Sequence, residues 1–141
     1  MEKAHNVRLY PLNITNKAII TPDVIEFLSE NSPTPFRPLL QPAFDYYFKA
    51  YQKNVPGING APMHDVVPLM ALTDPEFVKY IPRRVKVEEF GNVKGESIAD
   101  FRPKPDPEPP ETLDYIGMEA DILKFVSNFM EVFLQGDFEK K

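Results

Sequence analysis

The sequence predicts an α/β protein built as a single domain over residues 1–141, with one antiparallel β-hairpin added to layered strands and helices. Three observations support this fold class. The 141 residues are 43% hydrophobic and 26% charged, which is the composition of an ordinary globular domain. Stretches with the two-residue period of strands alternate with stretches of helical period. Many of the 16 prolines lie between these stretches and separate one element from the next.

The N-terminal part predicts a strand followed by a helix. Residues 7–15, VRLYPLNIT, indicate a strand that runs into a loop, and Pro11 marks its end because proline has no N–H to donate to a neighbouring strand. Residues 21–31, TPDVIEFLSEN, carry the signals of a helix start. Thr21 is suited to the N-cap and Pro22 to the first helical position.

The middle of the chain predicts two more helices. Five apolar or aromatic residues share one face of a helix entered near Pro42, and this stripe is more typical of core packing than of a cofactor site: Leu40, Phe44, Tyr47, Phe48 and Tyr51. Glycine, proline and asparagine over residues 53–62 end this helix. Asp65 then begins a short helix over 66–72, and residues 74–75, Asp-Pro, begin a further turn.

The C-terminal part predicts a hairpin, an extended loop, a strand and a helix. Residues 83–101 alternate on either side of a turn near residues 91–92, as a β-hairpin does. Residues 102–111, RPKPDPEPPE, cannot bury enough apolar surface to fold and should form a solvated loop. Residues 112–118 indicate a strand, and residues 119–136 an amphipathic helix that ends at Gly136.

Charge and residue usage exclude several classes of partner and fold. The net charge of -5 contains no basic block, so the chain lacks the electrostatic footprint of a protein that binds nucleic acid or an anionic membrane. The absence of cysteine excludes a disulfide framework, a zinc ribbon and a thiol nucleophile. No apolar run approaches the roughly 20 residues that span a bilayer, and the N-terminus does not resemble a signal peptide. We therefore expect a cytoplasmic protein.

The candidate for proton-transfer chemistry is His64. The phosphate-loop, dinucleotide-binding, zincin and hydrolase-elbow motifs are absent, and the other histidine, His5, lies in a terminal segment that gives it no assignable role. The residues alone favour a simple interpretation, in which Asp65 caps the following helix and His64 is its neighbour. In the alternative, both side chains overhang one pocket, where the carboxylate binds a hard cation and the imidazole transfers a proton.

Four blocks of the sequence resemble, in order, segments of the inosine-uridine preferring nucleoside hydrolase family. They are YPLNITNKAIITPDVIEFL at 10–28, GAPMHDVVPLMALTDPEF at 60–77, VKVEEFGNVKGESIADF at 85–101 and LDYIGMEADILKFVSNFMEVF at 113–133. The second block is similar to the family's C-terminal signature. The resemblance implies the C-terminal part of a layered fold, with helices packed on a mostly parallel sheet and an added β-hairpin.

The activity implied by the resemblance is hydrolysis of the N-glycosidic bond of purine and pyrimidine ribonucleosides to ribose and free base, with Ca2+ as cofactor. On the matching positions, Asp65 would be a calcium ligand, and His64 would face the nucleobase and assist its departure as general acid. An imidazole with an ordinary pKa near 6.5 suits a proton transfer of this kind. Tyr51 and Gln52 would contact the base, the first by stacking and the second by a hydrogen bond.

The sequence also departs from the family pattern. The family's DTDPGxDD motif, which supplies the catalytic base and most calcium-binding carboxylates, has no counterpart here. Val66 stands where the family has proline, and Asn13 stands where its PLDVT segment has aspartate. One carboxylate cannot hold calcium at useful affinity, because affinity follows the number of charged ligands. We therefore expect this chain alone not to hydrolyse nucleosides.

Three hypotheses remain open from the sequence. The chain is a fragment of a nucleoside hydrolase, or one subunit of a split enzyme whose other chain supplies the N-terminal portion, or a non-catalytic module for binding or oligomerisation. Removing the N-terminal strands of such a sheet would expose an unpaired edge and an apolar face. We therefore expect a homo-oligomer or a complex with a chain that supplies the N-terminal portion.

Overall fold

The structure is a computed structural model that describes residues 6–135, so His5 and the helix end predicted at Gly136 lie outside the described residues. The elements follow in the order β1 (Arg8–Leu9), α1 (Leu12–Thr15), β2 (Ile19–Ile20), α2 (Pro22–Asn31), α3 (Arg37–Asn54), β3 (Ala61–Pro62), α4 (Val66–Thr73), β4 (Val78–Arg83), β5 (Val85–Val87), β6 (Ser97–Ala99), β7 (Asp114–Ala120) and α5 (Ile122–Leu134). Two single 3-10 turns lie at Pro75–Phe77 and Pro110–Thr112. Within residues 6–135 no helix combines the length and hydropathy needed to cross a bilayer.

The largest sheet has the strand order β1-β7-β4. β1 runs parallel to β7, with Leu9 opposite Ile116, whereas β4 runs antiparallel to β7 along its whole length. The pairs β2–β3 and β5–β6 are also antiparallel. The mostly parallel sheet expected from the sequence is therefore not what the described strands form. The physical reason is the connection from β4 to β7, which is a hairpin and a proline-rich loop instead of the crossover helix that joins parallel strands.

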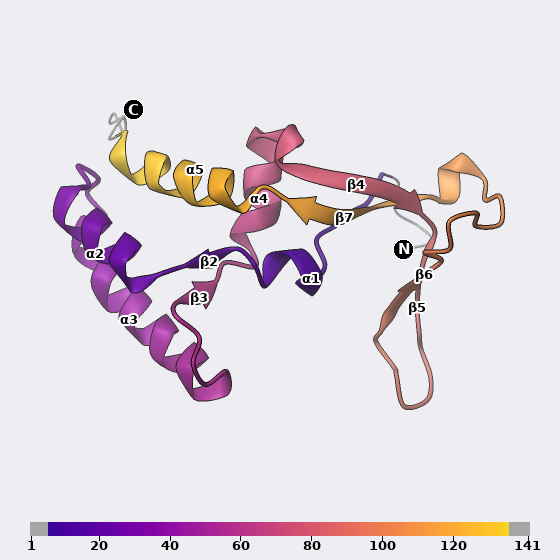
Figure 1. Cartoon of the computed structure of the whole chain (residues 1–141), viewed down its shortest axis with the longest axis horizontal. Helices are drawn as coiled ribbons and strands as arrows, with labels where there is room; N and C mark the ends of the chain where they lie inside the picture. Colours follow the sequence, from indigo (N-terminus) through magenta and orange to yellow (C-terminus); the bar gives the residue numbers. More distant parts are fainter. Residues whose placement is uncertain (1–5, 136–141) are drawn as a thin grey trace.

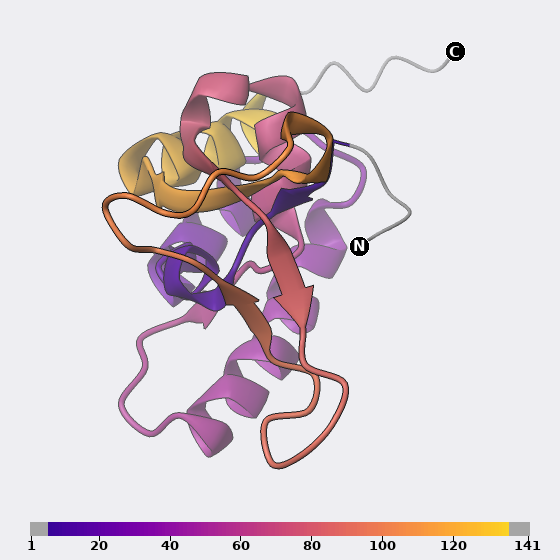
Figure 2. The same ribbon diagram turned by 90° about the vertical axis from the view of Figure 1, so that its right-hand side faces the viewer.

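The longer helices gather at one end of the molecule (Figure 1), and their side chains supply much of the core. Figure 1 shows α2, α3 and α5 gathered at the end of the molecule opposite the β5–β6 hairpin, and Figure 2 looks at the molecule from the hairpin end. Phe77 and Phe125 stack with ring centroids 6.0 Å apart and join the start of β4 to α5. The largest fully buried apolar side chains come from almost every layer: Phe77, Phe125, Ile14, Ile20, Ile25, Leu28 and Val67.

Most of the predicted elements are present. The helix predicted over residues 21–31 is α2, with Thr21 at the N-cap position and Pro22 in the first turn. The predicted hairpin is the β5–β6 pair, and the helix predicted over residues 119–136 contains α5. The aromatic stripe of α3 packs on the core, as predicted, with Leu40 and Phe48 buried.

Three local predictions need correction. The loop expected after the first strand is the short helix α1, because the Pro11 carbonyl accepts hydrogen bonds from both Ile14 N and Thr15 N. α3 begins at Arg37 and not near Pro42, which lies inside the helix with its side chain exposed. The turn predicted after Asp74 is present at Pro75–Phe77, but residues 78–82, for which no strand was predicted, belong to β4.

The short β2–β3 pair brings the segment before His64 against the start of the chain. Ile20 pairs with Ala61, and Met63 N donates to Ala18 O at 2.9 Å. Gly60 makes this close approach possible. Its φ is +120°, and a Cβ atom at this position would lie 2.2 Å from the Ile20 carbonyl oxygen. A side chain at residue 60 would therefore push the two strands apart.

We expect Gly60→Ala to lower the free energy of unfolding by about 2 kcal/mol or more, because it combines an unfavourable φ with a backbone clash. The matched control is Gly57→Ala. Gly57 also has a positive φ, +88°, but a Cβ there would meet nothing within 4 Å. Urea unfolding followed by circular dichroism measures both variants. Equal losses in the two variants would mean that contact with Ile20 does not constrain this turn.

Candidate functional site

His64 lies between β3 and α4, close to the segment that follows β1. Its side chain is half-buried, and its Nδ1 atom lies 2.8 Å from the Oγ1 atom of Thr15. Thr15 is the last residue of α1 and is only 2% exposed. The two residues are 49 positions apart in the sequence. The pairing of β2 with β3 therefore places His64 against a buried hydroxyl from the start of the chain.

The sequence did not single out Thr15 as a functional residue. It belongs to the PLNIT segment that carries part of the family resemblance, but no spacing pattern connects it with His64. A contact over 49 residues is set by the tertiary fold, so hydrophobic periodicity and helix signals carry no information about it. The resemblance of that segment was the one signal that pointed to this part of the chain.

Asp65 occupies the N-cap position of α4, as predicted, but its carboxylate makes no capping hydrogen bond. The expectation that this carboxylate accepts backbone N–H bonds is therefore wrong. The reason lies in the backbone, because Asp65 has helical angles, φ -79° and ψ -17°, whereas a capping residue is normally extended. The Asp65 side chain is exposed, so its oxygens can reach a ligand in the solvent.

Two tyrosines of α3 lie beside His64. The centroids of the Tyr51 and His64 rings are 6.3 Å apart, and Tyr51 meets Tyr47 edge to face at 5.0 Å. The Tyr47 hydroxyl donates to the Pro62 carbonyl at 3.1 Å, which ties α3 to β3 two residues before His64. Burial, together with Tyr51 and the charge of Asp65, raises the pKa of Tyr47 to about 12. Tyr47 therefore remains a hydrogen-bond donor at neutral pH.

The structure thus brings together three of the four residues predicted for the site. His64 and Asp65 are adjacent at the start of α4, and the Tyr51 ring lies beside the ring of His64. Gln52 follows Tyr51 in α3, so its side chain leaves the helix about 100° away from that of Tyr51. It is exposed, and in the described part of the chain no hydrogen bond joins it to His64 or Asp65.

Within residues 6–135, no group of three or more His, Cys, Asp or Glu side chains is placed to hold a metal ion. Asp65 is the carboxylate next to His64, and calcium takes about six to eight oxygen ligands. The described residues therefore do not fit a calcium ion by themselves.

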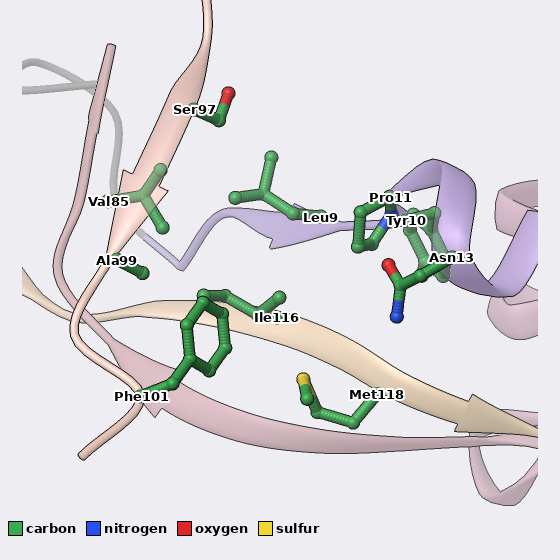
Figure 3. Close-up of a pocket in the computed structure, with 10 residues that line it drawn as sticks. All are labelled: Leu9, Tyr10, Pro11, Asn13, Val85, Ser97, Ala99, Phe101, Ile116 and Met118. Atoms are coloured by element: carbon green, nitrogen blue, oxygen red, sulfur yellow. The ribbon is translucent and has the colours of Figure 1, made fainter. Parts of the chain in front are cut away.

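A separate pocket of about 410 Å³ lies between the sheet and the β5–β6 hairpin (Figure 3). Leu9, Ile116 and Met118 form its sheet side, and Phe101 closes it from the hairpin side. Its lining has no charged residue, and none of the predicted site residues belongs to it. Asn13 lines this pocket, so the residue at the family's aspartate position brings a neutral amide to an apolar surface. Tyr10 and Ser97 bring hydroxyl groups to this pocket, but its lining contains no carboxylate, imidazole or amine.

Comparison with known proteins gives consistent matches. Residues 1–126 match the profile of the family described as inosine-uridine preferring nucleoside hydrolase. The inosine-uridine preferring nucleoside hydrolase of Crithidia fasciculata is 29% identical over 120 residues, which are 84% of this chain and 36% of that protein. The sequence over nearly the whole chain therefore carries the family signal.

Solved structures show the same fold. The purine-preferring ribonucleoside hydrolase from Gardnerella vaginalis superposes with a TM-score of 0.78 at 24% identity, over 92% of this chain and 40% of that one. A plant nucleoside hydrolase gives a TM-score of 0.78 at 21% identity, over 92% of this chain and 41% of that one. The chain therefore spans between 36% and 41% of the length of these relatives.

We expect Tyr47→Phe to lower the free energy of unfolding by about 1 kcal/mol, because it removes the donor to the Pro62 carbonyl and leaves that oxygen without its partner. Tyr46→Phe is the matched control, since Tyr46 is the neighbouring tyrosine of α3 and is 79% exposed. Urea unfolding at neutral pH measures the free energy of unfolding of both variants.

The same variant has a signature at alkaline pH. The pKa of Tyr47 is raised from 10.0 to about 12, so its stabilising contribution is complete below pH 10 and is lost as the pH rises toward 12. Tyr47→Phe should therefore flatten the fall in stability over that interval. An unaltered alkaline profile together with unaltered stability would show that the hydroxyl does not hold β3.

Proposed function

Because this chain belongs to the inosine-uridine preferring nucleoside hydrolase family, we propose that it provides the leaving-group side of a nucleoside-hydrolysing site. The family resemblance found in the sequence is confirmed by the match over residues 1–126. The chain spans well under half the length of the relatives it matches. The hydrolytic activity, the nucleoside substrate and the partners below are therefore proposals.

The observation that carries this proposal is the arrangement of His64. Its ring is held at Nδ1 by a buried hydroxyl and faces an aromatic ring on one side, while the exposed carboxylate of Asp65 follows it directly. Hydrolysis breaks the bond between C1′ of ribose and a base nitrogen, and the oxygen of water forms a new bond to C1′. The departing nitrogen gains electron density as the bond breaks, so a hydrogen-bond donor placed there lowers the barrier. We assign this donor to His64.

Tyr51 and Gln52 are proposed to contact the base. Tyr51 lies beside His64, and its ring offers an apolar face to a planar heterocycle. It also belongs to the aromatic stripe that packs on the core, so part of its ring is already in use. Gln52 carries an amide that can donate or accept, and its exposed position limits it to the edge of the base.

Asp65 is proposed as one ligand of a calcium ion that further polypeptide helps to complete. The described residues supply too few oxygen ligands, so the remaining carboxylates must come from elsewhere. In the completed site calcium would supply positive charge for binding ribose hydroxyls and water. Asp65 is exposed and makes no capping hydrogen bond to α4, so its carboxylate can serve as such a ligand.

A specific surface supports association with that further polypeptide. α4 reads VVPLMALT and has no charged face, and a helix of this kind is normally covered on all sides. Leu69 and Leu72 are nevertheless 62% and 72% exposed. Next to them, a groove of about 440 Å³ runs between α4 and α5, lined by Val66, Leu69, Met70, Thr73, Asn128, Phe129, Val132 and Phe133. We call this the α4–α5 groove.

We propose that the polypeptide carrying the missing carboxylates covers the α4–α5 groove. α4 begins directly after Asp65, so a segment packed along this helix reaches the site from its open side. Between 59% and 64% of each relative's own sequence lies outside the matched region, which is ample chain for such a segment. An association role without catalysis would use the same surface and is the second candidate function.

The catalytic proposal predicts that the chain with calcium and either inosine or uridine releases no ribose. Replacing the matched segment of the Crithidia fasciculata relative by this chain should restore ribose release. In that chimera, His64→Gln should lower kcat by roughly 10²- to 10⁴-fold, the usual contribution of a general acid. Asp65→Asn should raise the calcium concentration required.

The matched control is Asp23→Asn in the same chimera, because Asp23 is exposed in the first turn of α2. It should change neither kcat nor the calcium requirement. Ribose release by the chain alone would overturn the requirement for further polypeptide. A folded chimera that is inactive, or one that tolerates His64→Gln, would remove the catalytic role and favour association alone.

The association surface gives a separate prediction. Without its partner polypeptide, the chain should self-associate at high concentration through the α4–α5 groove. Leu69→Gln combined with Val132→Gln, both at exposed positions that line the groove, should shift the chain to monomer in sedimentation velocity. Leu123→Gln is the control, since Leu123 is 86% exposed on α5 but does not line the groove. If the control is as effective as the double variant, or if the unaltered chain is monomeric throughout, the groove is not the surface of association.

A further inference from the structure

We propose that the Thr15 hydroxyl fixes His64 as the tautomer that carries its proton on Nε2, which makes Thr15 a positioning residue for the site. The inference rests on the proposed role of His64, but its evidence is the hydrogen bond itself. Thr15 Oγ1 and His64 Nδ1 lie 2.8 Å apart, which is a good distance for a hydrogen bond between an oxygen and a nitrogen.

The direction of this hydrogen bond follows from what else the hydroxyl can contact. A threonine hydroxyl can donate or accept, and a neutral imidazole has one donor and one acceptor nitrogen. Thr15 is 2% exposed, and His64 is the partner of its hydroxyl within residues 6–135. If Nδ1 donated, the hydroxyl proton would be buried without an acceptor, which is unfavourable. The hydroxyl therefore donates to Nδ1, and the ring proton is on Nε2.

The backbone holds both partners in this geometry. Thr15 N donates to Pro11 O at 3.2 Å, and Ala18 N donates to Thr15 O at 3.1 Å, so Thr15 lies in a fixed turn. Met63 N in turn donates to Ala18 O at 2.9 Å, which fastens the residue before His64 to the same turn. One backbone bond and one side-chain bond thus join the two segments. Neither residue can move without disturbing the other.

The consequence for chemistry is a defined donor. Because Nδ1 is already hydrogen-bonded to Thr15, the Nε2–H group is the one that can donate to a ligand. Within the described residues, Nε2 has no hydrogen-bond partner. The Tyr51 ring at 6.3 Å limits rotation of the imidazole on one side. A nitrogen of a departing base is an acceptor, so it matches an N–H that is already aimed. In a ring free to exchange tautomers, Nε2 would be an acceptor for part of the time.

The test uses the chain labelled with nitrogen-15 at histidine, observed by NMR at mildly alkaline pH. The sequence has only two histidines, so a His5→Gln variant assigns the signals of His64. We expect Nε2 to show a bonded proton and Nδ1 to resonate as an unprotonated nitrogen. In Thr15→Val, which keeps the shape but removes the hydroxyl, both resonances should shift toward the average of two exchanging tautomers. Thr15→Ser should restore the pattern of the unaltered chain.

Thr21→Val is the matched control, because Thr21 makes no side-chain cap hydrogen bond at the start of α2. It should leave the His64 resonances unchanged. A proton on Nδ1 in the unaltered chain, or the same tautomer pattern in Thr15→Val, would overturn the proposal. If Thr15→Val does not fold, the proposal is still tested by the tautomer of His64 in the unaltered chain and by the spectrum of Thr15→Ser. The NMR measurement needs no nucleoside. The tautomer of His64 can therefore be established even if the proposed catalytic function proves wrong.

Discussion

The close packing of α1 on β7 is the contact on which the rest of the site depends. Gly117 of β7 has no side chain, and a Cβ there would lie 2.8 Å from Ile14 Cδ1 and 3.0 Å from Val78 Cγ1. Ile14 uses this space and is 1% exposed. Since Thr15 follows Ile14 in the same short helix, the space that Gly117 leaves for Ile14 helps to place the hydroxyl that contacts His64.

Three segments that are distant in sequence are held together by few polar contacts and much apolar packing. α1 provides Thr15, α3 provides Tyr47 and Tyr51, and the β3–α4 junction provides His64. The hydrogen bond from Tyr47 to Pro62 and the β2–β3 pairing fix the third segment against the other two. The single hydrogen bonds are each worth only about 1 kcal/mol, so the buried side chains around them supply most of the rigidity.

Sequence patterns predicted the elements whose signals are local. The Thr21-Pro22 helix start, the hairpin around residues 91–92 and the apolar face of α5 each depend on residues within one element. The N-cap position of Asp65 was also predicted, but not its backbone angles, which leave the carboxylate unused by the helix. β4 was missed because VKYIPR lacks clean alternation and contains a proline, and its stability comes from pairing with β7. The contact between Thr15 and His64 could not be predicted from local patterns either, because it also depends on tertiary packing.

The wide separation of Thr15 and His64 also says when the site can form during folding. Closing a loop of 49 residues costs more entropy than forming a helix turn, and it is compensated only when the intervening chain packs. That chain is α2 and α3, whose side chains enter the same core as Ile14. Secondary structure can therefore appear while the histidine is still unanchored. We therefore expect Nδ1 to acquire its partner late, as the core closes, so that the anchored ring marks a chain that has completed its fold.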